Sequence, residues 1–321
     1  MKKLITIAMS LILATSLFGC GASNSANSGG ETVQEETDAP RQMVTIEHSK
    51  GTVEVPKNPK KIAVFDFGIL DIIDSLGIDV DLALPVDSIP TYLSKYEKKA
   101  TNAGGIKEPN IEELFNYKPE VIFISGRQES FYEELSEIAP TVYIEINGAN
   151  YVNSVYYNTA VVNEIFDGKK ELAAEKFSDI YNKVEEVKKK AKKSEEKALV
   201  ILANSGAMST YGRGSRFGII FDDLGFTPVD EDIEVSTHGD EISYEYIAEK
   251  NPDIIFVIDR DAVVGGETDN SEILNNDLVN ETNAVKSGKV INLDPEIWYI
   301  AGGGISSINT MIEEVEAAFK E

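Results

Sequence analysis

Beyond residue 60, short apolar runs alternate along the chain with stretches of helical periodicity. The runs 62–67 and 121–125 predict buried strands, and helical patterns follow them at 70–76 and 130–138. Strands that alternate with helices in this way are typical of a parallel sheet covered by helices. The sequence therefore predicts an α/β fold.

A short antiparallel element precedes this pattern. Residues 43–47 and 52–55 alternate apolar and polar positions on either side of the polar segment 49–51, which predicts a β-hairpin. His48 falls at the edge of the turn. Because turns are normally solvated, we expect His48 to be exposed and to have no chemical role.

Part of the first half of the chain recurs in the second half. Residues 111–127 (IEELFNYKPEVIFISGR) align without gaps on residues 244–260 (YEYIAEKNPDIIFVIDR). An internal repeat of this kind indicates two similar structural units, so we expect two lobes, each with a mostly parallel sheet flanked by helices. The aligned pairs include Glu112 with Glu245, Pro119 with Pro252, and Arg127 with Arg260.

A single long helix is predicted between the two lobes. Residues 169–193 contain no Gly or Pro and place apolar side chains at spacings near three and four. Such a helix of about 25 residues is about 37 Å long. Since a helix cannot absorb large dihedral changes, we expect the lobes to rock by a small angle without clamping widely. The N-terminal lobe is then 43–168 and the C-terminal lobe 194–321.

The N-terminus has the pattern of an export signal. Two lysines precede the apolar run 4–18, which is shorter than the roughly 20 residues that cross a bilayer as a helix. The segment 1–19 resembles a bacterial lipoprotein signal, a family in which the following cysteine, here Cys20, carries the lipid. Residues 20–42 are rich in Gly, Ser, Asn, Thr and Glu and predict a flexible tether. We therefore expect the folded body to lie outside the cytoplasm.

Charge and composition exclude several classes of function. Lys and Arg total 30 against 55 Asp and Glu, a net charge of -25, and loss of residues 1–19 with their two lysines gives 28 minus 55, or -27. A surface this acidic argues against nucleic acid as a partner. One cysteine excludes a disulfide framework or a thiolate metal site, and two histidines exclude a His-rich zinc or copper site.

The few arginines occupy selected positions. The basic residues are 25 Lys and 5 Arg. Arg127 and Arg260 follow predicted strands, whose carboxyl ends face the ligand crevice in an open parallel sheet. Arg213 and Arg216 lie in the glycine-containing segment 211–216, called here the arginine loop. Guanidinium groups pair with oxyanions and stack on aromatic rings, so the pattern favours an anionic ligand and is compatible with an aromatic one. The alternative is four surface arginines in local salt bridges.

Two further side chains are candidate ligands of ferric iron. His238 lies in the segment 236–240, and Tyr299 precedes the glycine run 302–304. Imidazole and phenolate both coordinate this hard cation, and coordination would deprotonate the phenol. By spacing alone, a loop histidine and a loop tyrosine that lie far apart in sequence are more often packing residues than metal ligands.

Several longer strings of the sequence are similar to a known family. They are VFDFGILDIIDSLGI, SGRQESFYEELSEIAPTVYI, STHGDEISYEYI, NPDIIFVIDR and WYIAGGG. Together with the lipoprotein signal, they resemble the ABC-transporter substrate-binding lipoproteins for iron siderophores, and most of all the catecholate and petrobactin binders of bacilli. The resemblance extends from about Met43 to the C-terminus. It implies the class III periplasmic binding protein fold, in which one long α-helix joins two α/β lobes.

The resemblance also implies roles for individual residues. Arg127, Arg216 and Arg260 match the cleft arginines that neutralise the catecholate oxygens of an anionic ferric complex. His238 and Tyr299 match a pair that fills two iron positions when the siderophore supplies only four donors. The ligand would thus be an Fe(III)-siderophore, and no permanently bound cofactor is implied.

Two acidic residues and one cysteine match residues through which members of the family contact the permease or are attached to the membrane. Glu112 and Glu245 match the residues that each lobe presents to arginines of the ABC permease dimer, although ordinary surface glutamates are the alternative. Cys20 would hold the protein at the outer face of the cytoplasmic membrane. Arg213 has no match in the family, and we expect a monomer.

Two other functions are compatible with parts of the pattern. One is a binder of another anionic iron complex, or of haem, in the same fold. The other is a surface hydrolase that uses paired carboxylates such as Asp240 and Glu241. No GxSxG, P-loop or HExxH string occurs in the sequence, which disfavours an enzyme.

Overall fold

The structure, a computed structural model, describes residues 41–265, 270 and 273–320. These residues belong to one unit, which begins at Arg41. The predicted signal 1–19, Cys20 and nearly all of the predicted tether lie outside the described residues. Within the part that is described, no helix is both long enough and apolar enough to cross a membrane.

The first sheet is parallel throughout, with strand order β5-β4-β3-β6-β7. Alternate residues of its central strands enter two different cores, because successive side chains of a strand point to opposite faces. Ile62 and Val64 pack with α1 and α4, whereas Ala63 and Phe65 pack with α2 and α3. Burial on both faces explains the continuous apolar runs. The bounds are β3 Lys61–Val64, β4 Asp81–Leu84, β5 Thr101–Asn102, β6 Val121–Ile124, β7 Thr141–Tyr143, α1 Phe67–Ser75, α2 Ile111–Tyr117, α3 Tyr132–Ile138 and α4 Tyr151–Ile165.

The second sheet is mixed. Its order is β11-β9-β8-β12-β13, and β10 also pairs with β8. Strands β8, β10, β12 and β13 are parallel, but β9 and β11 run antiparallel to their neighbours. Ser205 and Gly206 join β8 to β9 with positive φ at both positions, as the type I′ turn of a two-residue hairpin requires. The bounds are β8 Lys197–Asn204, β9 Ala207–Thr210, β10 Thr227–Pro228, β11 Asp240–Ile242, β12 Ile254–Asp259, β13 Val290–Leu293, α6 Ile219–Asp222, α7 Tyr244–Lys250, α8 Asp261–Val264, α9 Asp277–Asn280 and α10 Asn283–Lys286.

The repeat detected in the sequence folds in the same way in both lobes. Helices α2 and α7 begin at equivalent caps, since Asn110 and Ser243 accept hydrogen bonds from the backbone three residues further on, at 3.1 and 3.3 Å. Both helices end at equivalent residues in the left-handed conformation, Lys118 with φ 56° and Asn251 with φ 46°. Each helix then leads into a central strand, β6 or β12.

The predicted hairpin is present as β1 Met43–His48 and β2 Gly51–Pro56, but the prediction for His48 is wrong. His48 is half-buried, because its ring packs edge-on against Tyr132 with ring centres 5.9 Å apart. Its Nδ1 accepts a hydrogen bond from the backbone of Lys50, and its Nε2 is buried without a partner among the described residues. Burial lowers the pKa of His48, so the ring is neutral at neutral pH.

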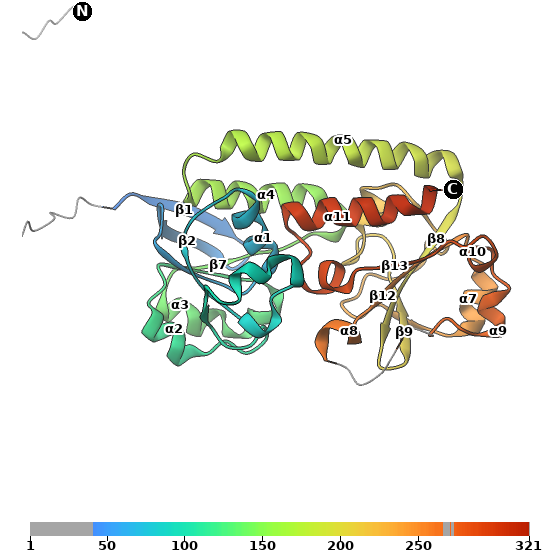
Figure 1. The fold of residues 1–321 in the computed structure, drawn as a ribbon, viewed down its shortest axis with the longest axis horizontal. Coiled ribbons are helices and arrows are strands. Elements are labelled where there is room, and N and C mark those ends of the chain that lie inside the picture. Colours follow the sequence, from blue (N-terminus) through green and yellow to red (C-terminus); the bar gives the residue numbers. More distant parts are fainter. Residues whose placement is uncertain (1–40, 266–269, 271–272, 321) are drawn as a thin grey trace, which may run out of the picture. The chain divides into compact units, whose positions relative to one another are not determined.

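One long helix and the last helix connect the two sheets. Helix α5, Lys170–Ser194, has 25 residues and lies over both α4 and α11, Ile305–Glu316 (Figure 1). Helix α11 belongs to the segment predicted as C-terminal lobe, yet it packs against α1 of the N-terminal lobe as well. One apolar core therefore runs through α1, α4, α5 and α11. The remaining short helices are η1 Val86–Ser88, η2 Thr91–Tyr96, η3 Gly126–Phe131, η4 Gly148–Asn150, the π-helical η5 Glu296–Ile300 and η6 Ala317–Phe319.

Candidate functional site

Three of the predicted arginines surround Tyr299. Arg127 comes from η3, directly after β6, Arg260 follows β12, and Arg216 lies in the arginine loop after β9. Their guanidinium carbons lie 5.8, 5.5 and 4.4 Å, respectively, from the centre of the Tyr299 ring. All three distances are within the range of cation–π attraction. The structure thus brings together side chains that are up to 172 positions apart in sequence.

Hydrogen bonds fix both polar ends of Tyr299. Arg260 donates from Nε to the phenol oxygen at 2.9 Å. Arg216 donates to the backbone carbonyl of Tyr299 at 3.2 Å, and Arg127 donates to the same carbonyl. Since Arg127 belongs to the N-terminal lobe and the other residues to the C-terminal lobe, this contact crosses between the lobes.

The surrounding cations make the phenol of Tyr299 more acidic. Burial alone would raise its pKa, but the hydrogen bond from Arg260 and the charges of Arg216, Arg260 and Arg127 act in the opposite direction and prevail. The net result is a pKa below the ordinary value for tyrosine. Tyr299 therefore loses its phenolic proton more readily than an ordinary tyrosine.

Positive charge is concentrated here at an energetic cost. Burial, followed by the charge of Arg216, lowers the pKa of Arg127. Two acidic residues face the arginines: Asp261 pairs with Arg260 at 3.8 Å, and the charge of Asp66 acts on Arg127. Asp66 also caps α1 by accepting a hydrogen bond from the backbone of Ile69 at 3.1 Å. Burial raises the pKa of Asp66, so its capacity to balance the arginines is reduced. An anionic ligand would relieve this excess of positive charge.

The turn that carries Tyr299 is a π-helix held from both sides. Glu296, at its start, accepts hydrogen bonds from the backbone nitrogen and the hydroxyl of Thr91 in the N-terminal lobe, at 2.7 and 2.8 Å. Trp298 donates from its indole nitrogen to Glu314 of α11 at 2.7 Å. π-Helical turns often occur at functional sites. Here the turn directs Tyr299 toward the arginines while Trp298 remains buried.

A pocket of about 330 Å³ opens beside this group and is lined from both lobes. Several residues that line this pocket were not predicted from the sequence. Asp66 and Tyr151 have no signal beyond their positions after an apolar run and at the start of a helix. The lining residues are Asp66, Ser125, Gly126, Arg127, Tyr143, Ile144, Glu145, Ile146, Tyr151, Arg216, Trp298, Tyr299, Ile300 and Gly302.

Arg213 does not contact Tyr299, unlike Arg216 in the same loop. It is exposed and donates to Glu231 at 3.1 Å and to Asp222 at 3.4 Å. It also donates to the carbonyl of Phe221 at 3.0 Å. The local salt-bridge interpretation therefore holds for Arg213.

His238 is not among the residues that line the pocket. It is exposed, in the loop between β10 and β11. The following residue, Gly239, lies close against the ring of Tyr211. Burial raises the pKa of Tyr211, and the charges of Arg216 and Arg260 partly oppose this effect. The base of the loop is thus near the arginines, while His238 itself faces solvent.

The remaining candidates are acidic. Glu112 and Glu245 are exposed in the first turns of α2 and α7, at equivalent positions of the two lobes. Asp240 and Glu241 are neighbours on strand β11, so their side chains point to opposite faces and do not form a pair for acid–base catalysis. Among the described residues, no three His, Cys, Asp or Glu side chains are gathered in a way that could hold a metal ion.

Comparisons with known proteins agree with this geometry. A family model described as periplasmic binding protein matches residues 62–297. The chain is 40% identical over 320 residues to the petrobactin-binding protein YclQ of Bacillus subtilis, covering 98% of each chain. It is 33% identical over 324 residues to the ferric-anguibactin-binding protein FatB of Vibrio anguillarum, again covering 98% of each.

Solved structures show the same fold. The crystal structure of YclQ superimposes with a TM-score of 0.84 at 41% identity, covering 88% of this chain and 100% of that one. The catecholate-siderophore-binding protein VctP of Vibrio cholerae superimposes with a TM-score of 0.80 at 33% identity, covering 86% and 100%. The predicted two-lobed α/β architecture is therefore confirmed.

Proposed function

The chain belongs to the periplasmic binding protein family, and on that premise we propose that it binds a ferric catecholate-type siderophore and delivers it to an ABC importer. The observation that carries the proposal is the convergence of Arg127, Arg216 and Arg260 on Tyr299 beside a pocket lined from both lobes. The relatives named for petrobactin, ferric anguibactin and catecholate siderophores support the class of ligand.

The arginines would supply most of the binding energy. A ferric catecholate complex carries negative charge on oxygen atoms bound to aromatic rings. Guanidinium groups form charge-assisted hydrogen bonds with such oxygens and stack on such rings. Because Arg127 already bridges the lobes through Tyr299, an anionic chelate would draw both lobes onto itself without a wide closing motion.

Tyr299 and His238 are proposed as two iron donors for a chelate that leaves two coordination positions open. The lowered pKa of Tyr299 favours the phenolate that ferric iron requires. His238 is exposed and lies outside the pocket lining, so its coordination requires the loop between β10 and β11 to move toward Tyr299.

Two glutamates and one cysteine are proposed to connect the protein to the permease and to the membrane. Glu112 and Glu245, exposed at equivalent positions of the two lobes, would dock on the two halves of a permease dimer. Cys20 would carry the lipid that holds the protein at the outer face of the cytoplasmic membrane. Two relatives of this chain in Bacillus subtilis are named lipoproteins, which supports an extracytoplasmic location.

Titration of the purified protein with a ferric catecholate tests the binding function. Trp298 lines the pocket, so its emission reports occupancy. We expect quenching at a one-to-one stoichiometry and recovery of the chelate unchanged. Arg216→Gln should weaken binding by about tenfold, because it removes a charge-assisted contact.

A matched control lies in the same loop. Arg213→Gln removes an arginine that is already paired with Glu231 and Asp222, so it should leave the affinity nearly unchanged. Equal losses in the two variants, or turnover of the chelate, would contradict the proposal.

A further inference from the structure

A second tyrosine, Tyr151, lines the arginine pocket from the N-terminal lobe. It is the first residue of α4 and is only 4% exposed. Arg216 acts on its phenol by charge, so the two side chains are close in space. A buried tyrosine at the wall of a cationic pocket is a candidate contact for the ligand of that pocket.

The hydroxyl of Tyr151 lies against Gly302, just after the turn that carries Tyr299. A Cβ atom on Gly302 would lie 2.5 Å from the hydroxyl oxygen, so glycine at this position leaves room for the phenol. Gly302 is itself part of the pocket lining. The hydroxyl is therefore at the wall of the pocket.

This hydroxyl has no hydrogen-bond partner among the described residues. Tyr151 bonds to another side chain only through its backbone nitrogen, which donates to Asp223. The charge of Asp66 acts on the phenol, but no hydrogen bond joins the two side chains. The hydroxyl is also not one of the described polar atoms that are sealed from solvent without a partner, so it keeps accessible surface in the pocket. A ligand or water in the pocket must satisfy it.

The phenol of Tyr151 keeps its proton at neutral pH. Burial raises its pKa, and the charge of Arg216 only partly opposes this effect. A neutral phenol is a hydrogen-bond donor. Tyr299 differs, because the surrounding arginines lower its pKa and Arg260 already donates to its oxygen. The pocket therefore contains one phenol that accepts from an arginine and one whose proton is free to be donated.

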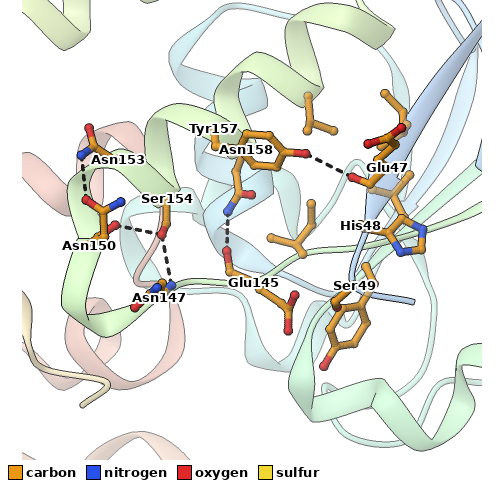
Figure 2. A pocket seen from close by; sticks show the side chains of 15 residues that line it. Glu47, His48, Ser49, Glu145, Asn147, Asn150, Asn153, Ser154, Tyr157 and Asn158 are labelled. Carbon is orange, nitrogen blue, oxygen red and sulfur yellow. Dashed lines mark hydrogen bonds between the residues drawn. The ribbon is translucent and has the colours of Figure 1, made fainter. Parts of the chain in front are cut away.

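Contacts around the first turn of α4 hold Tyr151 in place. Its backbone nitrogen donates at 3.2 Å to the carboxylate of Asp223, an acidic group at the helix N-terminus. Ser154 donates to the carbonyl of Asn150 at 2.9 Å and accepts from the backbone nitrogen of Asn147 at 3.1 Å (Figure 2). Because the backbone beside Tyr151 is fixed, little conformational entropy is lost when its phenol meets a ligand.

We propose that Tyr151 is a specificity-determining residue of the chelate site, whose hydroxyl donates a hydrogen bond to a negatively charged oxygen of the bound complex. The inference rests on the proposed function and deepens it, since it adds a neutral donor to the three arginines. A hydrogen bond to a charged acceptor is shorter and stronger than one between neutral groups. A chelate with an apolar group at this wall would leave the hydroxyl unpaired, so the contact selects against such a ligand.

Tyr151→Phe tests this assignment, because it removes the hydroxyl and keeps the ring. Titration with a synthetic ferric bis-catecholate, followed by emission of Trp298, should show binding weakened by about tenfold. The free variant should be at least as stable as the native protein in urea unfolding, since the hydroxyl has no protein partner to lose. Tyr156→Phe is the matched control: Tyr156 is exposed on the same helix, outside the lining of the arginine pocket, and its replacement should leave the affinity unchanged.

The outcomes separate this inference from the function on which it rests. If Tyr151→Phe binds the ferric bis-catecholate as tightly as the native protein while Arg216→Gln binds it more weakly, the role of Tyr151 is wrong and the proposed function stands. If Tyr151→Phe is less stable than the native protein without ligand, the hydroxyl serves the fold and the assignment is overturned. If the native protein does not bind the chelate, both fall together.

Discussion

Asp71 joins the two lobes, and its replacement by asparagine tests how they are held together. The side chain lies on α1 with no exposed surface. Its carboxylate accepts hydrogen bonds from the backbone nitrogens of Ser306 and Ser307 at 3.0 and 2.7 Å, at the start of α11. Ser75 and Tyr92 donate to the same carboxylate at 3.0 and 3.3 Å.

Asp71→Asn keeps the size of the side chain and changes its chemistry. One carboxylate oxygen becomes an NH2 group, which must face at least one of the backbone donors of α11. A hydrogen bond to a charged acceptor contributes about 1.5 to 3 kcal/mol, and a buried group left unpaired costs about 1 to 3 kcal/mol. The favourable interaction with the helix N-terminus is also weakened. Since these effects overlap, we expect unfolding free energy to fall by about 3 kcal/mol.

Urea unfolding at neutral pH, followed by circular dichroism and by emission of Trp298, measures this loss. Asp74→Asn is the matched control, because Asp74 lies one turn further along α1 and pairs with Lys95 and Tyr96 nearer the surface. Its replacement should cost less than about 1 kcal/mol. If both variants lost the same stability, the reasoning about a buried link between the lobes would be refuted.

Three further predictions concern the site and its partners. In Arg260→Gln the pKa of Tyr299 should rise, because a hydrogen bond and a positive charge are lost. In a spectrophotometric titration of the ferric complex, the visible phenolate-to-iron absorption should therefore appear at higher pH. Gly148→Ala places a methyl group into the backbone of the arginine loop, and should lower stability by about 1 to 3 kcal/mol in urea unfolding and weaken chelate binding in titration. Glu112→Gln and Glu245→Gln should leave the chelate Kd unchanged but reduce iron uptake by about tenfold in a transport assay.

The last two of these predictions have a variant for comparison. Gly126→Ala also adds a methyl group beside the pocket, but its nearest neighbour is the hydroxyl of Tyr143 at 3.8 Å, so it should be tolerated. Glu185→Gln on α5 should not affect uptake. Absorption that appears at the same or a lower pH in Arg260→Gln would contradict the first prediction. Equal effects of a test variant and its control would contradict the other two.

Much of the fold was predictable because it depends on local patterns and on the repeat. The apolar runs identified the central strands β3, β6 and β12, since strands buried on both faces contain few polar residues. The aligned segments predicted equal helices in the two lobes, and their caps at Asn110 and Ser243 confirm this equivalence.

The departures from prediction depend on contacts that are distant in sequence. The antiparallel strands β9 and β11 follow from a two-residue turn at Ser205 and Gly206, a weak signal in the sequence. The partial burial of His48 depends on Tyr132, which is 84 positions away by residue number (132 minus 48). Likewise, the packing of α11 on α1 depends on Asp71, and no sequence pattern near residue 305 indicates this contact.

The candidate site, like the fold, was only partly predictable from the sequence. The loop positions of Arg127, Arg216 and Arg260 were visible as arginines after strands or between glycines. The sequence did not predict that all three arginines contact one tyrosine, because their convergence depends on the tertiary structure.

The central claim is that Arg127, Arg216 and Arg260 select an anionic chelate, and competition between two ferric complexes tests it most directly. Isothermal titration would compare an anionic ferric catecholate with an uncharged ferric hydroxamate of similar size, for the native protein and for the variant with all three arginines replaced by glutamine. We predict that the native protein prefers the anionic complex by at least about tenfold, that added salt reduces this preference, and that the triple variant loses it. Equal binding of the uncharged complex by the native protein would contradict the account.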